Sequence, residues 1–189
     1  MKREGKVGLL TSNKNKYLEI SQLASTYGIE IEWLNYPKFE IQSDSLEEIA
    51  RTAAMVAFAQ LQRPLVVEDT GLFIEALNGF PGPYTNYVRR TIGINGILRI
   101  LQNIENRNAF FKTVVSYVDS KTIQIFTGIV YGKIAYEPRG SQGFGFDPIF
   151  IPEGDTRTFA ELSIEEKNKV SHRSIAFKKF LEFYVNYNT

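Results

Sequence analysis

The stretch Leu65-Val66-Val67-Glu68-Asp69-Thr70-Gly71-Leu72 decides the fold more than any other part of the chain. Three apolar residues in a row are typical of a strand buried on both faces of a sheet. Two acidic residues follow where we expect this strand to end, and Gly71 is expected to turn the backbone. Carboxylates in that position are carried on a rigid element and aimed at solvent, which suits a metal ligand or a general base. The alternative is a polar strand end before an ordinary turn.

Strands and helices alternate in the sequence that precedes this stretch. The pattern predicts, in order, a strand at 7–10, a helix closed by Gly28 as its C′ residue, a strand at about 30–35, and an Ala-rich helix that Ser45 caps and that ends before Arg63. The predicted strand at 65–69 comes next. Such alternation is typical of an α/β sheet.

The sequence after residue 78 follows a different pattern. It predicts a loop at 78–83, a helix at 94–104, a long antiparallel hairpin of strands 110–118 and 122–134, a strand at 148–151, a short helix capped by Ser163, and a final helix from Ser171 to about Tyr184. We therefore expect an α/β fold over residues 1–189, with an elongated mixed sheet, flanking helices and two lobes.

Composition limits the classes of function. The net charge of +1 does not favour a nucleic-acid partner, and the lack of cysteine excludes disulfides and thiol catalysis. The first apolar run, Val7–Leu10, is too short for a signal peptide or a membrane span. We expect a cytoplasmic protein that does not enter membranes.

A lysine-rich loop, Thr11-Ser12-Asn13-Lys14-Asn15-Lys16, lies between the first strand and the first helix. Lysines in the first turn of a helix are repelled by the partial positive charge at that end. The arrangement makes sense if an anion binds there, held by free backbone N–H groups and by Lys14 or Lys16. Two solvated surface lysines are the alternative.

Cationic residues also stand at the start of the predicted final helix, in Ser171-His172-Arg173. Ser171 is a good N-cap, whereas His172 and Arg173 add cations to a helix N-terminus. A guanidinium offers paired donors to a phosphate or to a purine edge, so Arg173 is the better candidate for ligand binding. His172 is the single histidine, and a structural role for it stays open.

A glycine-rich segment, Gly140–Pro148, holds three glycines with Phe144 and Phe146 between them. Glycines allow a ligand to approach closely, aromatic rings offer stacking faces, and Asp147 can meet a base edge. A flexible connection between strands is the alternative.

These segments together resemble the inosine triphosphate pyrophosphatase family, in its archaeal-type form. The resemblance is carried, in the family's order, by Thr11 to Lys16, Glu68 to Leu72, Leu77 to Gly82, Gly143 to Pro148, and the closing Ala160-Glu161-Leu162, Glu166-Lys167-Asn168 and Ser171-His172-Arg173. Departures are few: Ser12 stands where the family usually has glycine, and Phe146 where Tyr or Trp is common.

The resemblance implies an enzyme that cleaves ITP, dITP and XTP to the monophosphate and pyrophosphate, usually as a homodimer with its active site between the lobes. It implies Glu40 and Asp69 as Mg²⁺ ligands, with Asp69 also activating the attacking water. It implies substrate contacts from Thr11, Ser12, Asn13, Lys14, Lys16, Thr70, Phe144, Gly145, Phe146, Asp147, Lys167, His172 and Arg173. Phe146, with Phe144, is expected to stack on the purine, and Lys167 or Arg173 to meet its position-6 acceptor.

Two other functions stay open at this point. One is a pyrophosphatase that removes other modified nucleotides. The other is a sensor that binds a nucleotide without hydrolysing it. Such a protein would lack the catalytic acidic residues, whereas Glu68 and Asp69 are both present here.

Overall fold

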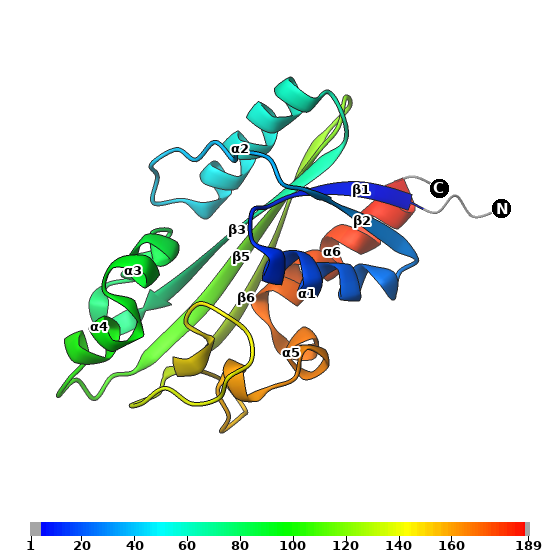
Figure 1. Cartoon of the computed structure of the whole chain (residues 1–189). Helices are drawn as coiled ribbons and strands as arrows, with labels where there is room; N and C mark the ends of the chain where they lie inside the picture. The colour runs from blue at the N-terminus through cyan, green and yellow to red at the C-terminus, as the bar shows by residue number, and fades with distance from the viewer. Residues whose placement is uncertain (1–4, 188–189) are drawn as a thin grey trace. The chain divides into compact units, whose positions relative to one another are not determined.

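The computed structural model describes residues 5–187, so the ends of the predicted range 1–189 lie outside the described residues. The elements follow one another along the chain as shown in Figure 1. They are β1 (Gly5–Leu10), α1 (Lys14–Ser25), β2 (Ile29–Leu34), α2 (Leu46–Leu61), β3 (Leu65–Ile74), η1 (Glu75–Leu77), β4 (Pro81–Gly82), α3 (Thr85–Thr91), α4 (Gly93–Ile100), β5 (Asn108–Val118), β6 (Ile123–Ile134), η2 (Asp147–Ile149), β7 (Phe150–Pro152), η3 (Phe159–Glu161), α5 (Ile164–Val170) and α6 (His172–Tyr187).

The strands form a mixed sheet in the hydrogen-bonded order β2-β1-β3-β5-β6-β7, with β4 paired to β3. β1 is parallel to both β2 and β3, whereas β7 is antiparallel to β6. The turn between β5 and β6 is closed by Asp119, whose N–H donates to the Thr122 carbonyl over 3.1 Å. The predicted mixed α/β sheet and its hairpin are therefore confirmed.

The chain divides into two compact units, each with its own core. Of the described residues, unit 1 contains 5–69, 113–128 and 173–187, and unit 2 contains 70–112 and 129–172. β3, β5 and β6 each begin in one unit and end in the other.

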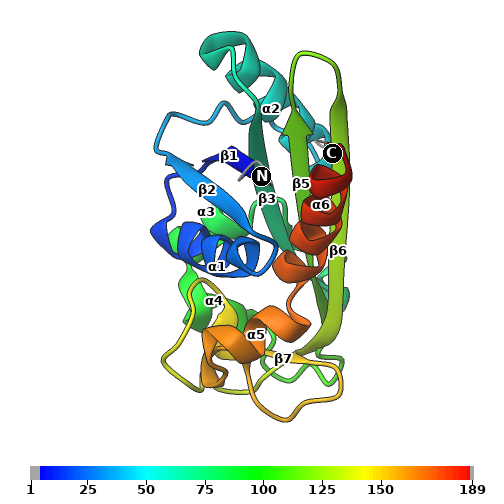
Figure 2. The same ribbon diagram turned by 90° about the vertical axis from the view of Figure 1, so that its right-hand side faces the viewer.

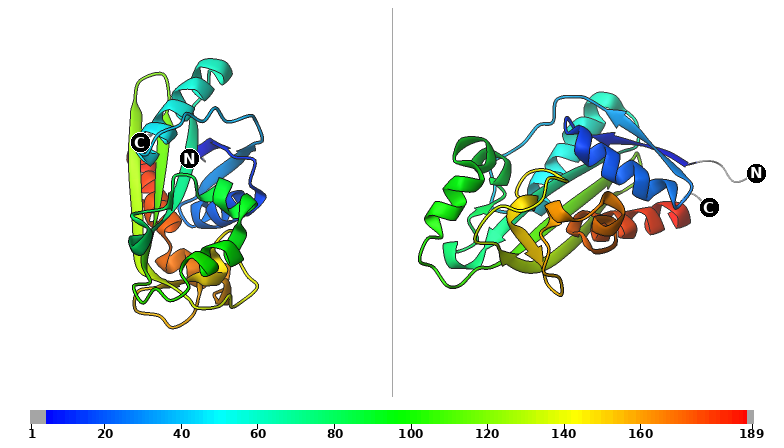
Figure 3. Two further views of the ribbon diagram at one scale, coloured as in Figure 1. Left: turned by 90° about the vertical axis from the view of Figure 1, so that its left-hand side faces the viewer. Right: turned by 60° about the horizontal axis from the view of Figure 1, so that its bottom comes forward.

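Helices cover both faces of the sheet in unit 1. Val7 and Leu9 of β1 pack with residues of α1 and α6, whereas Leu10 and Leu65 pack with the alanines of α2. Successive residues of a strand point to opposite faces, so these two clusters lie on opposite sides of the sheet. Figures 2 and 3 show α1 and α6 on one side of β1 and α2 on the other.

Unit 2 has a core of aliphatic and aromatic residues that includes Phe111, Phe146, Phe150 and Phe159. The helix predicted at 94–104 corresponds to α4, which ends at Ile100, four residues earlier than expected, whereas the preceding helix α3 was not predicted. The break between α3 and α4 falls at Ile92, and Gly93 begins α4 with a φ of +66°, a left-handed conformation that interrupts the regular helical backbone.

The prediction that the backbone turns at Gly71 was wrong, because β3 continues through Gly71 to Ile74. Gly71 instead allows close pairing with β4. A Cβ at Gly71 would lie 2.7 Å from the carbonyl oxygen of Gly82, which is too close for any other residue type. The glycine marks the approach of a second backbone rather than a turn.

Smaller differences concern element ends. α1 ends at Ser25 with Thr26 as C-cap, so Gly28 lies two residues beyond the cap and is not the C′ residue. The strand expected at 148–151 is a 3₁₀ turn, η2, followed by the short strand β7. Within residues 5–187, no helix combines the length and the apolar character needed to cross a membrane.

Candidate active site

The lysine-rich loop of unit 1 is organised by Asn13, the N-cap of α1. Its side-chain oxygen accepts hydrogen bonds from the N–H groups of Asn15 (2.9 Å) and Lys16 (3.3 Å). Asn13 N–H in turn donates to Thr11 Oγ1 over 3.1 Å. We expected free backbone amides at this helix start, but the Asn13 cap already accepts from those of Asn15 and Lys16. An anion at this loop therefore depends mainly on the lysine side chains.

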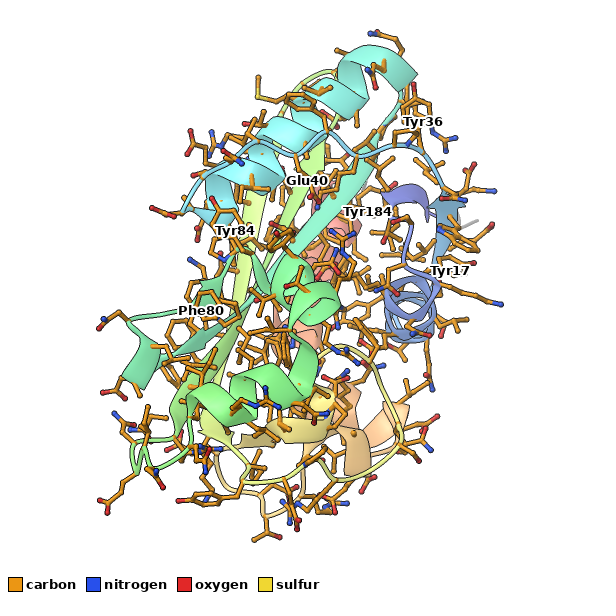
Figure 4. The ribbon with its side chains drawn as sticks, turned by 60° about the vertical axis from the view of Figure 1, so that its left-hand side comes forward. Tyr17, Tyr36, Glu40, Phe80, Tyr84 and Tyr184 are labelled. Carbon is orange, nitrogen blue, oxygen red and sulfur yellow. The ribbon has the colours of Figure 1, made fainter. Side chains whose placement is uncertain are left out.

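An aromatic pair supports the same loop. Trp33 of β2 donates its indole N–H to the Thr11 carbonyl over 2.6 Å. Its ring stacks on Tyr17 of α1, with centroids 5.3 Å apart and 15° between the planes. Figure 4 labels Tyr17 on this helix. The pair ties the end of β1 to the first turns of α1.

Glu68 is the centre of a buried ion network in unit 1. Only 3% of the residue is exposed. Lys16 Nζ lies 2.8 Å from one carboxylate oxygen and Arg173 Nη2 lies 3.3 Å from the other. Arg173 also bonds Glu19 over 2.7 Å, and its side chain is 4% exposed. Glu68 is thus a structural carboxylate that positions Lys16 and Arg173, and it is not aimed at solvent as its sequence position suggested.

Asp69 and Glu40, the predicted metal ligands, share one cation. Lys38 Nζ lies 2.8 Å from Glu40 Oε1 and 3.3 Å from Asp69 Oδ1. It also donates to the backbone carbonyl of Glu68 over 3.3 Å. Glu40 lies on the segment that leads into α2, where Figure 4 labels it, and Asp69 lies on β3. The two carboxylates therefore converge on a position that already attracts positive charge.

The ionisation of this group follows from burial and charge together. Burial raises the pKa of Asp69. The positive charges of Lys38 and Lys16 lower this pKa, whereas the negative charges of Glu68 and Glu40 raise it further. The net result is a pKa above the ordinary value of an aspartate. Burial alone would lower the pKa of Lys38, but the charges of Asp69 and Glu40 outweigh it and its pKa is raised. Lys38 is therefore charged at neutral pH, and Asp69 is a stronger base than an ordinary aspartate.

In unit 2, Asp147 brings together a lysine and an aromatic ring. Asp147 Oδ2 accepts from Lys167 Nζ over 2.7 Å and from the N–H of Phe144 over 2.8 Å. Lys167 Nζ lies 5.0 Å from the centroid of the Phe144 ring. The neighbouring Gly145 carbonyl accepts from Arg89 Nε over 2.9 Å. Phe144 is half-buried, so it keeps part of its surface accessible.

Phe146 and His172 lie in the interior of unit 2. Phe146 is 1% exposed and belongs to the core, so its ring does not offer a free stacking face. The stacking role expected for it fits Phe144 better. His172 is 2% exposed and its ring stacks on Phe111 at a centroid distance of 4.6 Å. This contact agrees with the structural alternative for the single histidine.

The structure thus collects the predicted residues into two groups. Unit 1 joins Lys16, Asp69, Glu40 and Arg173, and unit 2 joins Phe144, Asp147 and Lys167. Ser12 is exposed before α1, Lys14 is exposed at the first position of α1, and Thr70 lies within β3. Arg173 faces carboxylates of unit 1, so these contacts do not support the base-reading role expected for it.

Sequence reasoning missed two residues of the unit 1 group, Lys38 and Glu19. Lys38 stands two positions before Glu40 in a segment without helical structure, and residues two apart share a face of an extended chain. That spacing was an available signal. The sequence gives no comparable signal for Glu19, because a glutamate in the middle of a helix normally faces water.

Comparisons with known proteins show the family to which this chain belongs. The model of the Ham1 family matches residues 7–183. A protein of Saccharolobus solfataricus named dITP/XTP pyrophosphatase is 55% identical over 187 residues, which cover 99% of this chain and 97% of that protein. One of Methanopyrus kandleri with the same name is 54% identical over 182 residues, covering 96% and 97%.

A solved structure is similar as well. The HAM1 protein from Coxiella burnetii superposes with a TM-score of 0.84 at 30% identity, covering 96% of this chain and 99% of that one. The resemblance inferred from five sequence motifs is thereby confirmed, and the chain belongs to the Ham1 family.

Proposed function

We propose that this protein hydrolyses the deaminated purine nucleoside triphosphates ITP, dITP and XTP to the monophosphate and pyrophosphate. Family membership and the named activity of relatives about half identical in sequence support this. The observation that carries the proposal is the convergence of Asp69 and Glu40 on one cation, beside a loop that carries Lys16. Hydrolysis of a triphosphate requires positive charge to stabilise the phosphate oxygens and a base close by to activate water.

The donor set of unit 1 fits Mg²⁺. Within the described part of the chain, no three Asp, Glu or His side chains gather as a complete metal cage. Mg²⁺ commonly uses one or two carboxylates, with substrate phosphates and water completing its octahedral shell. Asp69 and Glu40 suffice for that arrangement, and the bound metal would stabilise the charge on the phosphate oxygens.

Asp69 is the proposed general base. Its raised pKa suits the removal of a proton from the water that attacks the α-phosphate, and pyrophosphate is the leaving group. Lys16, positioned by Glu68, would neutralise phosphate charge that builds up during the attack. Arg173 would hold Glu68 in place and thereby act as a positioning residue.

The unit 2 group is proposed to recognise the purine base. Phe144 offers a ring face, and the ammonium of Lys167, held by Asp147, can donate hydrogen bonds but cannot accept them. Hypoxanthine and xanthine carry an oxygen at position 6 that such a donor can meet. Adenine carries an amino group there, so donors would face each other unpaired.

We expect kcat/KM for ITP and XTP to exceed that for ATP by at least about 10², because a mismatched adenine leaves buried donors without partners. The measurement is pyrophosphate release from ITP, XTP, GTP and ATP at fixed Mg²⁺. Equal rates on all four would contradict the proposed base recognition. Preference for another modified nucleotide, or binding without turnover, would favour the two alternative functions.

Lys16→Ala should raise KM and lower kcat for triphosphates and reduce affinity for free pyrophosphate. The side chain lies at the predicted phosphate loop and its ammonium is 2.8 Å from Glu68. Steady-state kinetics and calorimetric titration with pyrophosphate measure the effect. Lys179→Ala is a matched control, because Lys179 is an exposed lysine that donates to the Thr127 carbonyl of the same unit. An unchanged kcat/KM in Lys16→Ala would contradict the phosphate role and leave Lys16 only its ion pair with Glu68.

The remaining expectations stay proposals. We propose a homodimer located in the cytoplasm, with a small-molecule substrate and without a nucleic-acid partner. The net charge of +1 agrees with the last point.

A further inference from the structure

Lys38 makes three polar contacts, and they match its three donors. An ammonium has three N–H groups and no acceptor. Lys38 Nζ lies 2.8 Å from Glu40 Oε1, 3.3 Å from Asp69 Oδ1 and 3.3 Å from the Glu68 carbonyl oxygen. The side chain is 16% exposed, so the head group sits among these oxygens rather than in open solvent.

The charge balance of unit 1 explains why a cation is held here. Two sets of ion pairs lie here: Lys16 and Arg173 balance the charges of Glu19 and Glu68, whereas Lys38 alone faces the two negative charges of Glu40 and Asp69. The charge of the second set is −1 with Lys38 and −2 without it. Asp69 and Glu40 repel one another, and this repulsion grows when burial removes water. Lys38 offsets it in the metal-free protein.

The same contacts make Lys38 a competitor for a metal. A divalent cation held by Asp69 and Glu40 needs the oxygens that Lys38 now occupies, at a shorter distance of about 2.0–2.1 Å for Mg²⁺. A second positive charge within a few ångströms also weakens the attraction for the metal. In the wild-type protein, free metal must therefore compete with the Lys38 ammonium for the carboxylates of Asp69 and Glu40.

Lys38 is placed so that it can leave these oxygens. It lies between β2 and α2 in a segment without regular secondary structure, whereas Asp69 is fixed on β3. Its four-carbon stem is flexible and carries the charge as a point at its end. When a triphosphate brings its own negative charge, that charge offers the ammonium new acceptors.

We propose that Lys38 is an intrinsic counter-ion that occupies the Asp69–Glu40 pair in the nucleotide-free protein and moves to the triphosphate when the metal–nucleotide complex binds. The inference rests on the proposed function, in which this pair holds the metal. Lys38 thereby keeps the affinity for free divalent metal low and couples metal binding to the arrival of the substrate.

The experiment titrates nucleotide-free protein with Mn²⁺, followed by electron paramagnetic resonance, with Mg²⁺ measured by competition. In Lys38→Met the affinity for both metals should rise about tenfold, because a neutral chain of similar length leaves the carboxylates without a competing cation. Lys38→Gln, which keeps a polar side chain, should behave in the same way. Circular dichroism checks that both variants remain folded.

Two controls make the outcome decisive. Lys6→Met removes the same charge from a lysine of unit 1 that pairs with Glu30 and Glu32, and it should leave metal affinity unchanged. Asp69→Asn should remove the weak Mn²⁺ binding that the wild-type protein retains. If it does, and both Lys38 variants change affinity by less than about threefold or weaken it, the counter-ion role is overturned while the metal pair stands. If Asp69→Asn binds Mn²⁺ like the wild type, the metal pair fails and the counter-ion role with it.

Discussion

Asp69→Asn should lower kcat for ITP by about 10³ or more while the protein stays folded. The substitution keeps the size of the side chain but removes the base and one of the two carboxylates proposed to hold the metal. The carbonyl oxygen of the new amide would still accept from Lys38, so the local packing need not change. Single-turnover and steady-state rates, with thermal unfolding of both proteins, measure the effect.

Glu40→Gln separates the two roles of Asp69. The Glu40 side chain is 59% exposed, so it is suited to hold a metal but not to act as the buried base. We expect the Mg²⁺ concentration for half-maximal rate to rise in this variant, with a smaller loss of kcat. If Asp69→Asn kept more than about a tenth of kcat, a loss below about 1.4 kcal/mol, the base assignment would be wrong.

Arg173→Ala should destabilise the protein by about 3–5 kcal/mol and lower its melting temperature by about 10 °C. The guanidinium pairs with Glu19 and Glu68, and all three side chains are at most 5% exposed. Removal of one partner leaves buried carboxylates uncompensated, which costs far more than the loss of a surface pair. Calorimetry and urea unfolding give the two values.

Arg63→Ala is the matched control, because Arg63 forms a pair with Glu32 in the same unit at the surface, with side chains 40% and 32% exposed. It should cost no more than about 1 kcal/mol. Comparable losses in the two variants would contradict the buried network. In Arg173→Ala, we expect kcat/KM to fall equally for ITP and ATP, and a loss confined to ITP would restore the base-reading hypothesis for Arg173.

Local patterns predicted much of the architecture. The apolar run of β1 and the strand–helix alternation as far as β3 reflect how neighbouring residues pack, and the sequence displays this directly. The capping box of α5 was also predictable, because Ser163 and Glu166 satisfy each other's backbone donors at a fixed spacing. The motifs likewise identified most members of both site groups.

Long-range pairing explains the failures. Gly71 looked like a turn because the approach of the Gly82 backbone, eleven residues later, is invisible locally. Arg173 looked like a ligand-binding cation because its partner Glu19 is 154 residues away. Phe146 looked like a stacking ring because the glycines around it suggest an open loop, whereas its burial depends on a core built by distant strands.

Trp33 gives the protein an optical reporter of its own. It is the single tryptophan in the chain, so intrinsic fluorescence excited at the indole band reports on one place. That place is the lysine-rich loop proposed to bind phosphate, because the indole N–H donates to the Thr11 carbonyl and the ring stacks on Tyr17 of α1. Emission from an indole depends on its hydrogen bonding and on its exposure, which is 36% here. Ligand binding to the loop can therefore be followed without a label or a modified nucleotide.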